Sequence, residues 1–266
     1  MTRPSRRLPR TGFTMVGVLV TIIIIVILFA LAMQAAKQGL GGGGTSIEKN
    51  QVSTHVDREN LRRIYQGMAV FASSNDFIYP SPTQIAQSRD ISLNTSANFW
   101  SSLIAQGIVA PQQLISENER NWNVIRECTT YNVESYNPAR GLYWDTSFKA
   151  DLTSESNVSF AHLVLHGERF RQHWRMGGDA STALFGNRGP KDGAPNPGSL
   201  AVDSGSGAWR GNVVFGDGHI EFLTVPYYSG RANDNLFMVD DGPNGRDSIL
   251  GFTARVWNGG FDLQWD

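Results

Sequence analysis

An aspartate and a histidine stand two residues apart in the segment GNVVFGDGHIEF, residues 211–222. A histidine near an aspartate can act as a general base or bind zinc, so Asp217 and His219 are candidates for chemistry. Asp217-Gly218 between two apolar segments is also a strong hairpin signal, because Gly supplies the positive φ that a tight turn requires. The chain contains neither G-x-S-x-G nor H-E-x-x-H. We therefore interpret Asp217, Gly218 and His219 as a structural turn and expect no enzymatic activity.

A second group of candidate ligands lies upstream and consists of His162, His166, Glu168 and His173. His162 and His166 are four residues apart, a spacing that would place both on one face of a helix and could serve zinc. Residues 158–165, VSFAHLVL, instead have the composition of a strand, in which that spacing gives no tight pair. We predict no zinc site here.

Hard oxygen ligands gather in the stretch DDGPNGRDS, residues 240–248. Calcium binds several such oxygens, so Asp240, Asp241, Asn244 and Asp247 form a calcium hypothesis. Their spacing does not match an EF-hand, and an ordinary acidic turn is the favoured alternative. We predict no other cofactor.

Aromatic residues offer a further binding hypothesis. The chain has seven tryptophans, which with its Tyr and Asn residues could form a carbohydrate-binding surface, although aromatic side chains are more often part of a core. The single cysteine, Cys128, cannot form an internal disulfide. The tryptophans are Trp100, Trp122, Trp144, Trp174, Trp209, Trp257 and Trp265.

Hydrophobic periodicity predicts the elements that position these residues. From Val52 to Ala72 apolar residues recur at steps of three and four, which indicates an amphipathic helix that Asn75-Asp76 ends. A short helix is expected at 97–106, and Ser116-x-x-Glu119 predicts a weak helix reaching Cys128. We predict an α+β fold in which the amphipathic helix packs on an antiparallel sheet, with an irregular surface excursion at 186–207. The expected strands are 158–165, 182–185, 212–215, 220–225 and 249–256.

The N-terminal segment carries the strongest functional signal. Residues 13–36, FTMVGVLVTIIIIVILFALAMQAA, contain no charged side chain. A helix needs about 20 apolar residues to cross a bilayer, and in lipid its backbone must be hydrogen-bonded internally, so we predict a transmembrane helix at 13–37. The arginines before it place the N-terminus in the cytoplasm and the rest of the chain outside the inner membrane, in the periplasm. The net charge of −1 gives no reason to expect a nucleic-acid partner.

A basic leader that ends at Gly12, directly before the apolar run, resembles the class III signal of pilin-like proteins. The motif is R-T-G-F-T-M-V. The resemblance implies cleavage between Gly12 and Phe13 by a prepilin peptidase and methylation of the Phe13 amine. The segment LRRIYQGMAVFA and the F-x-D-G-H-x-x-F hairpin resemble the head helix and C-terminal hairpin of the same group. Major pseudopilins of type II secretion are also similar in using a calcium-binding loop near the C-terminus.

Two features depart from that pattern. The fifth residue after the expected cleavage site is Gly17, where the family has a glutamate that pairs with a neighbouring subunit's amine. The four glycines at 41–44 indicate a flexible joint over 38–50, whereas the family continues the anchor helix into the head. The expected organisation is thus a leader at 1–12, an assembly helix at 13–37, the joint at 38–50 and a globular domain at 51–266.

Together these features predict a structural, pseudopilin-like subunit of a type II secretion or type IV pilus-like system, minor rather than major. Its expected partners are the prepilin peptidase, other pilin-like subunits and the membrane. One alternative is a membrane-anchored binding protein, for example for carbohydrate, that uses the leader only for delivery. A plain signal anchor with a chance Gly-Phe pair and an anchored hydrolase using His219 are weaker alternatives.

Overall fold

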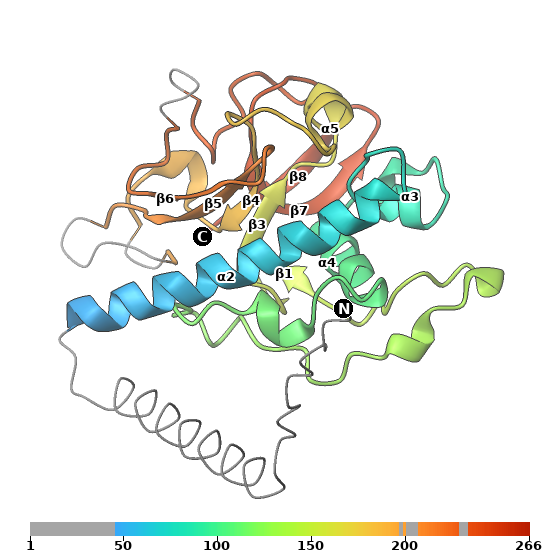
Figure 1. The fold of residues 1–266 in the computed structure, drawn as a ribbon, viewed down its shortest axis with the longest axis horizontal. Helices are drawn as coiled ribbons and strands as arrows, with labels where there is room; N and C mark the ends of the chain where they lie inside the picture. The colour runs from blue at the N-terminus through green and yellow to red at the C-terminus, as the bar shows by residue number, and fades with distance from the viewer. Residues whose placement is uncertain (1–45, 197–198, 201–206, 229–233) are drawn as a thin grey trace, which may run out of the picture. The chain divides into compact units, whose positions relative to one another are not determined.

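The structure is a computed structural model that describes residues 46–196, 199–200, 207–228 and 234–266 (Figure 1). The chain divides into two compact units, residues 1–49 and residues 50–266, and the second unit contains every described strand. The predicted leader and the predicted transmembrane helix at 13–37 lie outside the described residues. Within the described ranges, no helix combines the length and the apolar character that a membrane span requires.

Helix α2, Ser46–Ser73, is the predicted amphipathic helix. It ends at the predicted place, because Asp76 and Phe77 adopt φ angles of 53° and 59° and the N–H of Phe77 bonds back to the Ala72 carbonyl. Its start at Ser46 corrects the joint predicted over 38–50, since the last five residues of that range are helical. The side chains that α2 buries completely recur at steps of three and four and are Leu61, Ile64, Met68 and Ala72.

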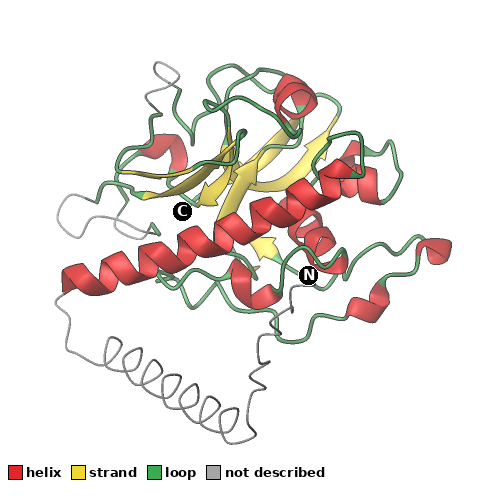
Figure 2. Ribbon diagram, viewed as in Figure 1, coloured by secondary structure: helices red, strands yellow, loops and turns green. Residues whose placement is uncertain are grey.

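One antiparallel sheet of six strands forms the centre of the second unit, in the order β6-β5-β4-β3-β7-β8 (Figures 1 and 2). Three of its four inner strands, β3, β4 and β5, are buried at every position, which explains why their sequences are mostly apolar on both faces. Five of the six strands match the five predicted ones, and β8 was missed. The strands are β3 Phe160–Leu163, β4 Ala183–Asn187, β5 Gly211–Phe215, β6 Ile220–Leu223, β7 Leu250–Trp257 and β8 Gly260–Gln264.

Helix α2 hydrogen-bonds to this sheet through its third and fourth turns. Asn187 of β4 donates to the Asp57 carboxyl group, Asn212 of β5 donates to the Thr54 carbonyl, and Arg58 donates to the Ile220 carbonyl of β6. Figure 2 shows the long helix crossing the strands on one face of the sheet. The predicted α+β fold with an antiparallel sheet is therefore confirmed for the globular part.

Shorter elements connect these two layers. The helix predicted at 97–106 is α4, Ser96–Ala105, whose N-terminus is capped by Thr95. Helix α5, Gly167–His173, was not predicted. The remaining short elements are α3 Pro82–Ile85, the strand pair β1 Ala150–Asp151 and β2 Glu155–Ser156, and the 3₁₀ turns η1 Ile91–Leu93, η2 Pro111–Leu114, η3 Val133–Ser135, η4 Pro138–Arg140 and η5 Lys191–Gly193.

Two local predictions were wrong. Residues 116–128 do not form a helix, because the two side chains of the expected capping box turn to distant partners instead: Ser116 donates to Asp57, and Glu119 pairs with Arg188. The segment 186–207 is not simply a surface excursion either. Its first residues continue β4, and the buried side chains of Arg188 and Leu200 anchor it to the core.

Candidate functional site

The predicted hairpin joins β5 to β6. The N–H of Phe215 donates to the His219 carbonyl at 3.0 Å, and the N–H of Gly218 donates to the Phe215 carbonyl at 2.8 Å. Gly218 has a φ of 88°, so it supplies the left-handed backbone that the turn needs. A Cβ atom at this position would lie 2.4 Å from the ring of Tyr65 on α2. The turn therefore needs glycine twice, for its backbone and for its contact with the helix.

The side chains of Asp217 and His219 form a local pair at the tip of this hairpin. Asp217 Oδ1 accepts hydrogen bonds from the His219 backbone N–H at 3.0 Å and from its Nδ1 at 2.6 Å. Partial burial opposes the charge on Asp217, but the hydrogen bonds from His219 lower the pKa of its carboxyl group. The imidazole stacks on Phe215 with ring centroids 4.5 Å apart, and its Nε2 lies 4.0 Å from Glu221.

Chemically, this pair resembles the oriented half of a catalytic dyad. Asp217 holds the imidazole in one tautomer and leaves Nε2 at the half-exposed surface. In the described part of the chain, no serine, threonine or cysteine side chain hydrogen-bonds to that nitrogen. The geometry supports the interpretation of Asp217, Gly218 and His219 as a structural turn.

The upstream histidines separate in the fold. His162 on β3 is fully buried, and its Nε2 lies 2.7 Å from Ser96 Oγ. His166 Nδ1 lies 3.0 Å from the Pro243 carbonyl, and His173 contacts Thr182. Across the residues that the structure describes, no three His, Cys, Asp or Glu side chains are grouped as a metal site would need.

An arginine occupies the centre of the loop at 240–248. The fully buried Arg169 of α5 pairs with Asp247 and donates to the carbonyls of Gly242 and Pro243 at 2.7 and 2.8 Å. These oxygens are a cation's ligands, and here a guanidinium satisfies them. No local sequence pattern could have indicated this pairing, because Arg169 lies 78 residues from Asp247.

In this described loop, the side chains of the other calcium candidates make no hydrogen bond or ion pair with that arginine and differ in their surroundings. Asp241 Oδ2 accepts from the Arg246 backbone N–H at 2.7 Å, and Asn244 is exposed. Burial and the neighbouring Asp247 carboxylate raise the pKa of Asp240. The arrangement fits an arginine-clamped acidic loop better than a calcium site.

The tryptophans divide between core and surface. Four are buried, and Trp265 is partly buried with its Nε1 donating to the Leu250 carbonyl at 3.3 Å. Trp122 and Trp257 are 54% and 47% exposed, so they are what remains of a possible aromatic surface. The buried four are Trp100, Trp144, Trp174 and Trp209.

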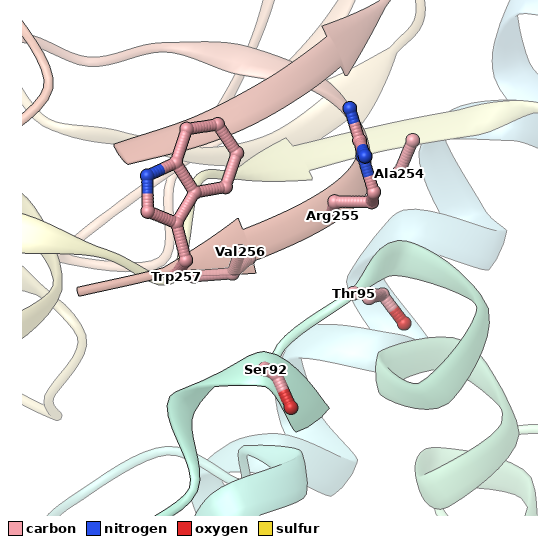
Figure 3. A pocket seen from close by; sticks show the side chains of 6 residues that line it. All are labelled: Ser92, Thr95, Ala254, Arg255, Val256 and Trp257. Carbon is pink, nitrogen blue, oxygen red and sulfur yellow. The ribbon is translucent and has the colours of Figure 1, made fainter. Parts of the chain in front are cut away.

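Trp257 borders a hollow of about 490 Å³ between β7 and the turn η1 (Figure 3). Figure 3 shows that Trp257 and Arg255 extend from β7 in one direction, whereas Ser92 and Thr95 point away from them. Arg255 donates to Asp262 on β8 at 2.6 Å. The hollow is thus open and its polar groups do not converge, unlike the usual small-molecule pocket.

A second hollow, of about 540 Å³, lies between the segment after α3 and residues 141–146. Trp144 forms part of its wall, and the Trp144 Nε1 donates to Asn98 at 3.0 Å. No charged side chain lines this hollow, so it offers no acid, base or ion-binding group.

Two buried polar clusters were not predicted. In the first, Arg188 pairs with both Glu119 and Asp266, and all three side chains are nearly inaccessible. In the second, Asp57 on α2 accepts hydrogen bonds from three neutral side chains. The sequence holds only a weak signal for the second cluster. Asp57 lies four residues before Leu61, on the face of the amphipathic helix where an apolar residue would be expected.

The predicted processing residues, Gly12 and Phe13, lie outside the described residues, and so does Gly17, where a glutamate was expected from the resemblance. Comparison of the chain with family models, with curated proteins and with solved structures found no match.

Proposed function

We propose that this protein is a structural, pilin-like subunit that one N-terminal helix holds in the inner membrane, and that it is a minor component of a type II secretion or type IV pilus-like system. The observation that carries the proposal is a long amphipathic helix packed on an antiparallel sheet, with the hairpin at 211–223 packed on that helix through Gly218 and Tyr65. This is the arrangement that the resemblance to pilin-like heads leads us to expect. The uncharged run at 13–36 supplies the anchor.

The hydrogen bonds of the candidate reactive groups support a structural role. Asp217 fixes the imidazole of His219 within a turn, and Arg169 binds the oxygen ligands of the 240–248 loop. Each candidate site therefore stabilises a local segment of the head.

The first experiment measures the mature N-terminus by mass spectrometry. Wild-type protein from cells with an active prepilin peptidase should begin with methylated Phe13, and Gly12→Val should keep the leader. Gly39→Val is the matched control, since it makes the same substitution beyond the anchor and should be processed normally. Wild-type protein that still begins at Met1 would contradict the proposal.

A second experiment tests the minor role. A buried carboxylate in lipid is tolerable when it has a partner, and Gly17 removes that assembly contact. Wild-type protein should therefore stay in the membrane fraction when filaments are sheared off, while Gly17→Glu should enter filaments more. Gly17→Gln, which has similar size but no charge, is the control. Abundant homopolymer of the wild type would contradict a minor role.

A second candidate function is carbohydrate binding at Trp257, in a protein delivered by the same leader. The observation in its favour is a half-exposed indole at the edge of the hollow between β7 and η1. Aromatic faces with adjacent polar groups suit ligands that have one apolar and one polar side. A glycan array probed with wild type, Trp257→Ala and the control Trp122→Ala tests this. Binding that Trp257→Ala retains would refute it.

A further inference from the structure

Helix α2 carries a buried carboxyl group toward the sheet. Asp57 is 1% exposed. Its Oδ2 accepts hydrogen bonds from Ser116 Oγ at 2.6 Å, Asn118 Nδ2 at 3.2 Å and Asn187 Nδ2 at 3.0 Å. All three donors are neutral, and within the described ranges no arginine, lysine or histidine pairs with Asp57. A carboxylate buried without a cation is strongly unfavourable.

Two oxygen atoms at this contact lack a hydrogen-bond donor, Asp57 Oδ1 and Asn212 Oδ1. The two residues are linked through Asn187, whose Nδ2 donates to Asp57 and whose Oδ1 accepts from the Asn212 backbone N–H at 2.8 Å. Asn212 Nδ2 donates to the Thr54 carbonyl at 3.0 Å, one helical turn before Asp57. That bond fixes the orientation of the Asn212 amide, because the flipped amide would set two carbonyl oxygens against each other.

We propose that Asp57 is a neutral carboxylic acid whose Oδ1–H donates to Asn212 Oδ1 and so fastens α2 to the sheet. A single proton gives both unpartnered oxygens a hydrogen bond and removes the buried charge.

The surrounding charges leave this assignment unopposed. Burial raises the pKa of Asp57, and the hydrogen bonds from the side chains of Ser116, Asn187 and Asn118 and from the backbone N–H of Glu117 only partly offset it. On α2 itself, Arg58 is bonded to the Ile220 carbonyl of β6. On the other packed elements, Glu119 and Arg188 are paired with each other. The remaining charged groups next to the partners of Asp57 are Glu117 on the loop after η2 and Arg210 before β5.

The sign of the pH effect follows from the raised pKa. The neutral acid contributes fully below the pKa of an unfolded aspartate, about 3.9, and its contribution is lost as pH rises through the folded value. Helix α2 should therefore be held less tightly at higher pH. In the titration window, the opening equilibrium of the helix should increase by up to about tenfold per pH unit.

The test uses the full chain in detergent micelles and two measurements. Infrared spectroscopy detects the carbonyl stretch of a protonated carboxyl group, and subtraction of the Asp57→Asn spectrum assigns it. Hydrogen exchange of α2 amides, corrected for intrinsic rates, reports how tightly the helix is held. Wild type should show the band, lose it as pH rises, and exchange faster in the same window. Asp57→Asn should show neither change, because its amide can donate to Asn212 at every pH.

Two further variants make the result decisive. Asp145→Asn is the matched control, since Asp145 is also buried but accepts from the backbone N–H groups of Asn132 and Ser147. This variant should keep the carbonyl band of the wild type and the same pH dependence of hydrogen exchange in α2. Asn212→Ala removes the acceptor and should shift the loss of the band to lower pH. The proposal is overturned if no band assignable to Asp57 exists at any pH at which the protein is folded, or if Asn212→Ala leaves its titration unchanged.

Discussion

Replacing His162 by glutamine should remove much of the acid sensitivity of the globular unit. His162 is fully buried on β3. Its Nδ1 lies 2.8 Å from the Leu163 carbonyl, so this nitrogen carries the proton, and its Nε2 accepts from Ser96 Oγ at 2.7 Å. The ring also packs on Phe99, with centroids 4.4 Å apart. The neutral imidazole is thus the form that the core accommodates.

The magnitude follows from the shift in pKa. Burial lowers the pKa of His162 from 6.5 to about 4, so the unfolded chain binds a proton that the folded protein excludes. Stability is complete above the unfolded pKa and falls as pH drops toward the folded one. At about 1.4 kcal/mol per pKa unit, the shift corresponds to a total of about 3 kcal/mol, of which about 2 kcal/mol is lost as pH falls from about 7.5 to 5.

Urea unfolding of the chain from Ser46 onward, followed by tryptophan fluorescence, measures this loss. As pH falls over that range, the free energy of unfolding of the wild type should drop by about 2 kcal/mol more than that of His162→Gln. His55→Gln, at an exposed position of α2, is the control and should parallel the wild type. Acidic groups cancel in the comparison because all three proteins share them. Parallel pH profiles for wild type and His162→Gln would refute the reasoning.

Three further predictions concern other contacts of the head, each measured by urea unfolding. Gly218→Ala should lower the free energy of unfolding by at least about 1 kcal/mol, because Gly218 has a φ of 88° and the added Cβ would meet the Tyr65 ring. In a Tyr65→Ala background the same substitution should cost less, and an unchanged cost would show that the contact with Tyr65 plays no part. Arg188→Met should cost about 3–5 kcal/mol by leaving Glu119 buried and unpaired, and adding Glu119→Gln should restore part of it. Arg169→Gln should destabilise the 240–248 loop, and calcium should then stabilise this variant but not the wild type; equal effects of calcium on both would contradict the idea that the guanidinium fills the cation position.

The hairpin and the arginine-clamped loop show how far local sequence reaches into the site. Asp217-Gly218 predicted a turn correctly because a turn needs only its own backbone angles and those of its neighbours. The acidic stretch at 240–248 suggested calcium because clustered carboxylates look alike whether a metal or a guanidinium neutralises them. Arg169, which decides between the two, comes from α5, an element the sequence did not predict.

The wrong helix prediction at 116–128 has the same origin. Ser116 and Glu119 have the spacing of a capping box, but bonds to Asp57 and Arg188 outweigh the local alternative. Strand β8 was missed for a different reason: residues 261–265, FDLQW, alternate between apolar and polar side chains, and this readable strand pattern was overlooked.

The sequence by itself determined the amphipathic helix, five strands, the turn at Gly218 and the α+β class, because periodicity and backbone conformation are properties of neighbouring residues. It also determined the uncharged run at 13–36 on which the proposed anchor rests. The tertiary structure alone decided which polar groups are buried together: Asp57 with Asn187 and Asn212, and Arg188 with Glu119. These partners lie far apart in the chain, and the energy of a buried polar group depends on whether a partner reaches it, which only the folded packing fixes.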